Sequence, residues 1–140
     1  MLPNIGTHRL SEVWNYSTVL FMSPQFYYVL HLAGILLVFL AYGLLIGRAL
    51  LRSDNSGVRR LGAIASGIGL LLILVSGFAL LAKLDFGWPA WALIKMAVWL
   101  GLGGMVAAIN RRPQLGQLWF WVLIILGLIA VLSVYLKPTF

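Results

Sequence analysis

Long runs of apolar residues alternate with short polar stretches along the chain. Four runs stand out, and they cover residues 26–51, 61–82, 90–109 and 118–136. Each run, as a helix rising about 1.5 Å per residue, is long enough to span the roughly 30 Å of hydrocarbon in a bilayer. The pattern predicts an all-α fold, a four-transmembrane-helix bundle, in one integral membrane domain over residues 1–140.

The segment before the first run has a mixed character. In residues 1–22, apolar side chains recur at roughly helical spacing between polar ones, which suits a short N-terminal interfacial helix anchored by Trp14. Ser23 and Pro24 follow, and serine is a favoured N-cap while proline fits the first helical position. They therefore predict the start of the first membrane helix.

Small residues spaced four apart recur in three of the runs and predict how the helices pack. The pairs are Gly43 with Gly47, Gly62 with Ser66, Gly103 with Ala107, and Gly104 with Ala108. This spacing lets helix backbones approach closely in lipid. We therefore expect a compact bundle.

Composition supports a membrane protein whose main partner is the lipid bilayer. Hydrophobic residues make up 62% of the chain and charged residues 9%, which no ordinary soluble domain shows. The chain has no cysteine, which excludes disulfides and thiolate metal sites. Its net charge of +7 comes from residues beside the apolar runs, so it predicts membrane topology and no nucleic-acid partner.

The basic residues predict the orientation of the helices. The loops after the first and third runs, with the residues at their edges, carry Arg48, Arg52, Arg59, Arg60, Arg111 and Arg112. The opposite face has fewer basic residues, diluted by Glu12 and Asp85. By the positive-inside rule, the arginine-rich loops are cytoplasmic and the N- and C-termini lie outside, in a multi-pass protein of a bacterial inner membrane.

Few polar side chains lie within the runs, and two of them are basic: His31 in the first and Lys95 in the third. Ionisable groups in hydrocarbon are costly and mark functional sites by default. No Asp or Glu lies within a run, which argues against a proton pump or ion-coupled carrier. A nucleophile triad is also disfavoured, because neither histidine has an obvious carboxylate partner.

His31 and Lys95 are expected at the same depth. Both runs enter from the same side, and each residue lies five or six positions into its helix, or roughly 8 Å deep. Tyr27 precedes His31 by one turn, and Gly34 follows it by one turn on the same face. We expect Gly34 to leave a gap beside the imidazole that a planar ring could enter.

Aromatic side chains flank Lys95, since Trp91 and Trp99 lie one turn to either side of it. A cation and an imidazole without an acid between them suit a porphyrin, whose propionates pair with Lys95 while His31 binds the haem iron. The alternative is that His31 donates to a backbone carbonyl and Lys95 extends to the headgroups. Such a haem would have a single histidine ligand, use Met22, Met96 or Met105 as its second ligand, or bridge two subunits; two histidine ligands from one chain require that His8 folds down into the bundle.

Several short motifs occur in an order found in a known family. They are His31-Leu32-Ala33-Gly34-Ile35, Arg59-Arg60-Leu61, Trp91 followed by Lys95, Asn110-Arg111-Arg112-Pro113 and Lys137-Pro138-Thr139-Phe140. Together they resemble the HemJ-type four-helix membrane proteins, the haem-associated protoporphyrinogen IX oxidases of bacteria, and more distantly the SirB family. The chain differs from the HemJ pattern at Arg111, where that family has glutamate, at Val38 and at Gly103-Gly104.

The resemblance implies a protein that binds haem b or a porphyrin near its outer face, with an oxidase-like or electron-transfer role. His31 would correspond to the family's haem-linked histidine and Lys95 to its third-span lysine. A second hypothesis is a non-catalytic accessory subunit of a larger membrane complex, or a homo-oligomer, which the small size and the lack of an intramembrane acid favour. A third, transport of a small molecule, requires dimerisation of so small a bundle.

Overall fold

The structure is a computed structural model that describes residues 9, 10, 12, 18, 23–84 and 87–136. The interfacial helix expected over residues 1–22 falls mostly outside the described residues, as does the motif at 137–140, so both stay predictions. The fold below concerns the part of the chain from Ser23 to Leu136.

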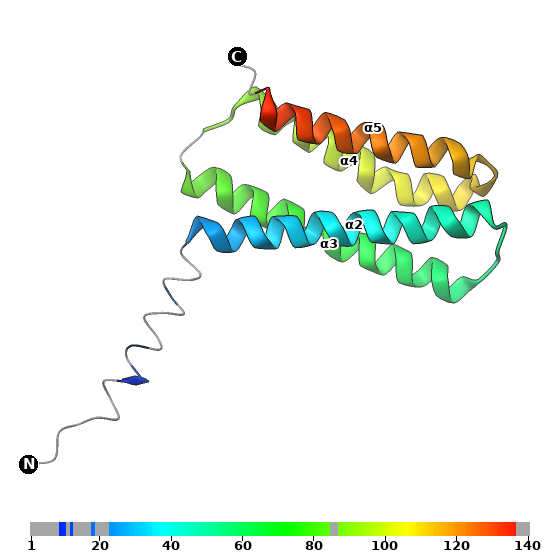
Figure 1. Cartoon of the computed structure of the whole chain (residues 1–140), viewed down its shortest axis with the longest axis horizontal. Coiled ribbons are helices and arrows are strands. Elements are labelled where there is room, and N and C mark those ends of the chain that lie inside the picture. Colours follow the sequence, from blue (N-terminus) through cyan, green and yellow to red (C-terminus); the bar gives the residue numbers. More distant parts are fainter. Residues whose placement is uncertain (1–8, 11, 13–17, 19–22, 85–86, 137–140) are drawn as a thin grey trace, which may run out of the picture.

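Four long helices run side by side and alternate in direction (Figure 1). They are α2 (Pro24–Leu50), α3 (Ser56–Lys83), α4 (Ala90–Arg111) and α5 (Gly116–Tyr135), with a short 3-10 helix, η1 (Pro113–Leu115), before α5. Each of the four long helices is long enough and apolar enough to cross a membrane. The predicted all-α bundle is confirmed, and the chain is a small multi-pass membrane protein.

The helix boundaries follow local sequence chemistry. Helix α2 begins at Pro24 with Ser23 in the N-cap position, as predicted. Helix α3 begins at Ser56 rather than near residue 61, because the Val58 N–H donates to the Asn55 Oδ1 at 3.1 Å and caps the helix there. Helix α3 therefore extends beyond the apolar run 61–82 at its N-terminal end.

Glycines place α2 and α3 in close contact. A Cβ on Gly34 would lie 2.9 Å from the Gly69 carbonyl oxygen, and a Cβ on Gly69 would lie 2.7 Å from the Val38 Cγ2. A Cβ on Gly62 would lie 2.6 Å from the Leu45 Cγ. The backbones of the two helices therefore meet where side chains other than glycine would keep them apart.

The small-residue pairs divide into an inner and an outer set. Gly62 packs against Leu45 of α2, and Ser66 is buried as well, so this pair lies in a close helix contact as expected. By contrast, nothing lies within 4 Å of the Cβ position of the outer glycines, which are Gly43, Gly47, Gly103 and Gly104. The expectation that these pairs pack the bundle is wrong for α2 and α4, since the core there is made by larger side chains.

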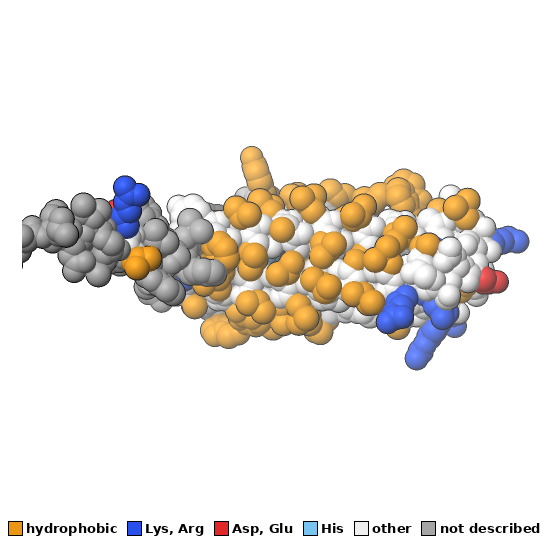
Figure 2. Space-filling model, turned by 90° about the horizontal axis from the view of Figure 1, so that it is seen from below, with side chains coloured by type: hydrophobic (Ala, Val, Ile, Leu, Met, Phe, Trp, Pro, Cys, Tyr) orange, Lys and Arg blue, Asp and Glu red, His pale blue; other side chains and the backbone are white. Residues whose placement is uncertain are grey.

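The core lies among the four helices, with most of its buried residues on α2 and α4, and is tied by two hydrogen bonds from aromatic side chains. The Tyr42 hydroxyl, fully buried on α2, donates to the Leu102 carbonyl of α4. The Trp99 indole N–H donates to the Leu70 carbonyl of α3 at 2.9 Å. Figure 2 shows apolar side chains over the length of the bundle, with basic side chains gathered at one end.

Candidate functional site

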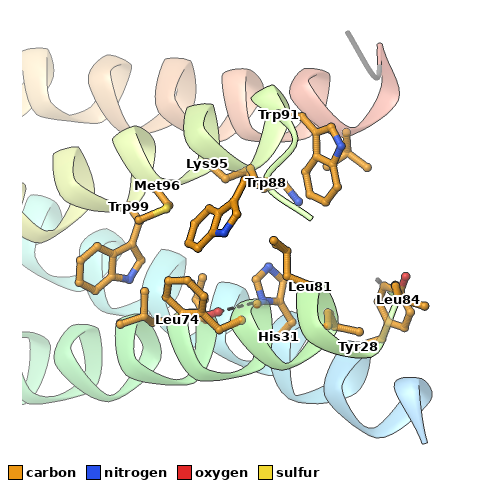
Figure 3. Close-up of a pocket in the computed structure, with 16 residues that line it drawn as sticks. Tyr28, His31, Leu74, Leu81, Leu84, Trp88, Trp91, Lys95, Met96 and Trp99 are labelled. Atoms are coloured by element: carbon orange, nitrogen blue, oxygen red, sulfur yellow. Dashed lines mark hydrogen bonds between the residues drawn. The ribbon is translucent and has the colours of Figure 1, made fainter. Parts of the chain in front are cut away.

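A cavity of about 310 Å³ lies among α2, α3 and α4, near the end of the bundle where α2 begins. Its walls are mostly apolar and rich in aromatic rings: Tyr28, Phe78, Trp88, Trp91 and Trp99. His31 from α2 and Lys95 from α4 are its two basic groups (Figure 3). The structure therefore brings together the two intramembrane basic residues that the sequence singled out.

Helix α3 fixes the imidazole of His31 through one ring nitrogen. The Nδ1 atom lies 3.1 Å from the Ile73 carbonyl oxygen and 3.0 Å from the Ser76 Oγ. The Ser76 hydroxyl donates its proton to the Leu72 carbonyl, so towards His31 it can only accept. Because both partners of Nδ1 accept, Nδ1 carries a proton, and in the neutral form of the imidazole Nε2 is the unprotonated nitrogen.

The Nε2 atom of His31 has no hydrogen-bond partner among the described residues. Its ring is one of the cavity walls and stands between α3 and the overlying α4 in Figure 3. Metal-binding histidines commonly donate their other ring N–H to a backbone carbonyl, which orients the ring. The contact between Nδ1 and Ile73 has this form and leaves Nε2 available to a ligand.

Lys95 supplies a positive charge to the same cavity. Its Nζ lies 5.3 Å from the centroid of the Trp91 ring, a cation–π distance, and its side chain reaches toward Trp91 in Figure 3. No carboxylate of the described residues pairs with this ammonium group, which is half-buried. An anionic group at the cavity mouth would meet this charge with few competing partners.

The other residues predicted for the site divide between cavity and helix contacts. Trp91 and Trp99 line the cavity as expected from their positions beside Lys95. Tyr27 does not; its ring lies 5.6 Å from the Lys83 Nζ, and its neighbour Tyr28 takes its place in the wall.

Gly34 lies in the contact between α2 and α3 and not in the cavity wall. The predicted gap beside Gly34 does not exist, because the backbone of α3 at Gly69 and Ile73 fills it. The open space lies on another side of His31, toward α4. The expectation that a planar ring enters beside Gly34 is therefore wrong.

Two further residues gain importance from the structure. Ser76, buried on α3, sets the orientation and tautomer of His31. Met96 lines the cavity, whereas Met105 is buried in the core at 3% exposure and Met22 is not among the described residues. Sequence alone offered Met96 only as one of several methionines, and neither residue could be paired with His31 before the helix contacts were known.

The side chains that line the cavity supply one imidazole nitrogen, one ammonium group, one thioether and aromatic walls. The described residues hold no cluster of three or more His, Cys, Asp or Glu that could hold a metal ion. A planar anionic ring that brings its own metal ligands fits this donor set better.

None of the protein-family models, curated proteins or solved structures compared with the chain matches it.

Proposed function

We propose that this small multi-pass membrane protein binds haem b or a related porphyrin in the cavity between His31 and Lys95. The observation that carries the proposal is the state of His31. Helix α3 holds its Nδ1 as a donor, and its Nε2 faces the cavity without a hydrogen-bond partner among the described residues. A cavity histidine oriented in this way is ready to coordinate iron.

The rest of the cavity matches the chemistry of a tetrapyrrole. Its apolar and aromatic walls suit the ring, and the Lys95 ammonium group suits a propionate. The cavity volume of about 310 Å³ is at the small end for ligand pockets. Several wall residues, including Tyr28, Trp88 and Met96, are exposed on the bundle surface, so part of the ring would lie toward lipid.

Among the described methionines, Met96 would be the one to supply a second iron ligand. Met96 lines the cavity, whereas Met105 lies in the core among side chains of α2 and α4. Histidine–methionine ligation raises the reduction potential of haem. Bound haem would supply one-electron chemistry, and the chain would position it, balance its propionate charge and exclude water from its buried face.

The proposed orientation follows the arginines. The termini and the His31 cavity lie at the outer face of a bacterial inner membrane, and the arginine-rich loops lie in the cytoplasm. This topology is supported by the gathering of basic side chains at the far end of the bundle from the cavity (Figure 2).

Haemin titration of the detergent-purified protein tests the proposal. We expect saturable binding with a Soret shift in the wild type and loss of the shift in His31→Ala. His8→Ala is the matched control, because His8 is the other histidine of the chain, and it should bind as the wild type does. Equal titrations for wild type and His31→Ala would refute His31 as the ligand.

A matched pair of methionine variants tests the second ligand. The Met96→Leu variant should still bind haemin, but its absorption spectrum should shift toward that of haem with one histidine ligand. The Met105→Leu variant should have the absorption spectrum of the wild type. If His8→Ala rather than Met96→Leu changes the spectrum, the assignment of Met96 is wrong.

A second candidate function, an accessory subunit of a membrane complex or a homo-oligomer, is favoured by one observation. Gly103 and Gly104 expose a smooth strip of α4 with nothing within 4 Å of their Cβ positions. Such strips accept a second helix in lipid. Gly103→Leu should then dissociate the assembly in mild detergent without loss of the fold, and unchanged assembly would remove the support for this function.

A further inference from the structure

A second cavity lies at the arginine-rich end of the bundle, opposite the His31 cavity. It has a volume of about 230 Å³ and is formed by the loop after α2 and by the start of η1. Its lining residues are Arg48, Ala49, Arg52, Ser53, Asp54, Pro113 and Gln114. We call it the Arg48 pocket.

Arg48 is an unusual side chain for this position, because it carries a charge yet is only 9% exposed. Its Nη1 donates to the Ser53 carbonyl at 3.1 Å, and its Nη2 lies 3.5 Å from the Asn110 Oδ1. Its Nε is buried and has no partner among the described residues. Burying a charge against neutral acceptors alone is costly, so an anion near Arg48 would be strongly favoured.

Arg52 is held in a backbone conformation that normally selects glycine. Its φ is 49°, and it occupies the position after the C-cap of α2. The Arg52 N–H donates to the Ala49 carbonyl and the Ser53 N–H to the Arg48 carbonyl, both at 3.1 Å, which is the Schellman pattern. Arg52 adopts this conformation at a cost, and its side chain lines the pocket.

The charge balance of the pocket favours an anion. Asp54 also lines it, but this carboxylate is exposed and forms no ion pair with any described residue. Two guanidinium groups therefore face one carboxylate, and four more arginines lie on the flanking segments of this end: Arg59, Arg60, Arg111 and Arg112. The planar donor fork of arginine matches the oxygens of a phosphate group.

We propose that the Arg48 pocket binds the phosphate group of an anionic phospholipid headgroup. The pocket lies at the ends of membrane-spanning helices, the level at which headgroups sit. Leu50 and Leu51, next to it, are 54% and 81% exposed and offer an apolar surface to the acyl chains. Free inorganic phosphate shares the recognised chemistry and is the other source to be tested.

Native mass spectrometry of the delipidated full chain, with phosphatidylglycerol or phosphatidylcholine added, measures this binding. We expect the anionic lipid to bind at least roughly tenfold more tightly, as one charge-assisted contact would give. Arg48→Met should abolish the preference. Arg52→Gly should weaken it several-fold while the protein unfolds at a higher temperature, because glycine relieves the backbone strain.

Arg111→Met is the matched control, since Arg111 is an exposed arginine at the same end that does not line the pocket. It should leave the preference unchanged. Competition by inorganic phosphate that depends on Arg48 would support recognition of the phosphate group, and binding of inorganic phosphate without the lipid would assign a free anion as the source. Equal losses in Arg48→Met and Arg111→Met, or no preference in the wild type, would overturn the proposal.

Discussion

Replacing Gly34 by alanine tests the contact between α2 and α3 that orients His31. The added Cβ would lie 2.9 Å from the Gly69 carbonyl oxygen and 3.0 Å from the Ile73 backbone nitrogen, so backbone atoms must move. Such overpacking costs about 1–3 kcal/mol. The higher helix propensity of alanine returns about 0.5–1 kcal/mol. We therefore expect a net loss of up to about 2.5 kcal/mol in the free energy of unfolding.

Gly43→Ala is the matched control, because Gly43 lies on the same helix with nothing within 4 Å of its Cβ position. It should be neutral or more stable than the wild type. SDS-induced unfolding in mixed micelles, followed by far-UV circular dichroism, measures both variants. Their difference isolates the steric cost, since the propensity gain is common to both. Equal stabilities would refute the close contact at Gly34.

Three further changes have defined outcomes. Tyr42→Phe removes the buried hydrogen bond to Leu102 and should lower stability by about 0.5–1.5 kcal/mol in the same assay; an unchanged midpoint would contradict that bond. Lys95→Gln should weaken haemin binding by about threefold to tenfold without altering the ligation spectrum, because in the proposed complex the partly exposed charge would contact a propionate and not the iron. Arg52→Gly should raise stability by about 0.5–1 kcal/mol, and a loss would show that the Arg52 side chain contributes more than its strain costs.

The four helices could be predicted from sequence because hydrocarbon imposes a long apolar run on every span. The start of α2 at Pro24 followed from the preference of proline for the first helical position. The early start of α3 at Ser56 did not, because it depends on the Asn55 cap in a segment that also has turn-forming composition.

The sequence predicted which basic residues belong to the site, but it did not predict the shape of the cavity. His31 and Lys95 stand out because polar groups are rare in the spans, and depth counting places them together. The side of the His31 ring that stays open depends on which helix packs against α2. Gly69 lets α3 pack against α2 at Gly34, which closes that side. Helix pairing of this kind depends on contacts between helices, which the small-residue spacing of one helix does not specify.

The haem content of the protein purified from membranes tests the central claim most directly. The chain, expressed with ample haem supply, is extracted in mild detergent and assayed by its pyridine haemochrome spectrum alongside His31→Ala. We expect a b-type spectrum in proportion to the protein for the wild type and its loss in the variant. A wild type without haem, or a His31→Ala variant with the same haem content, would contradict the proposed function.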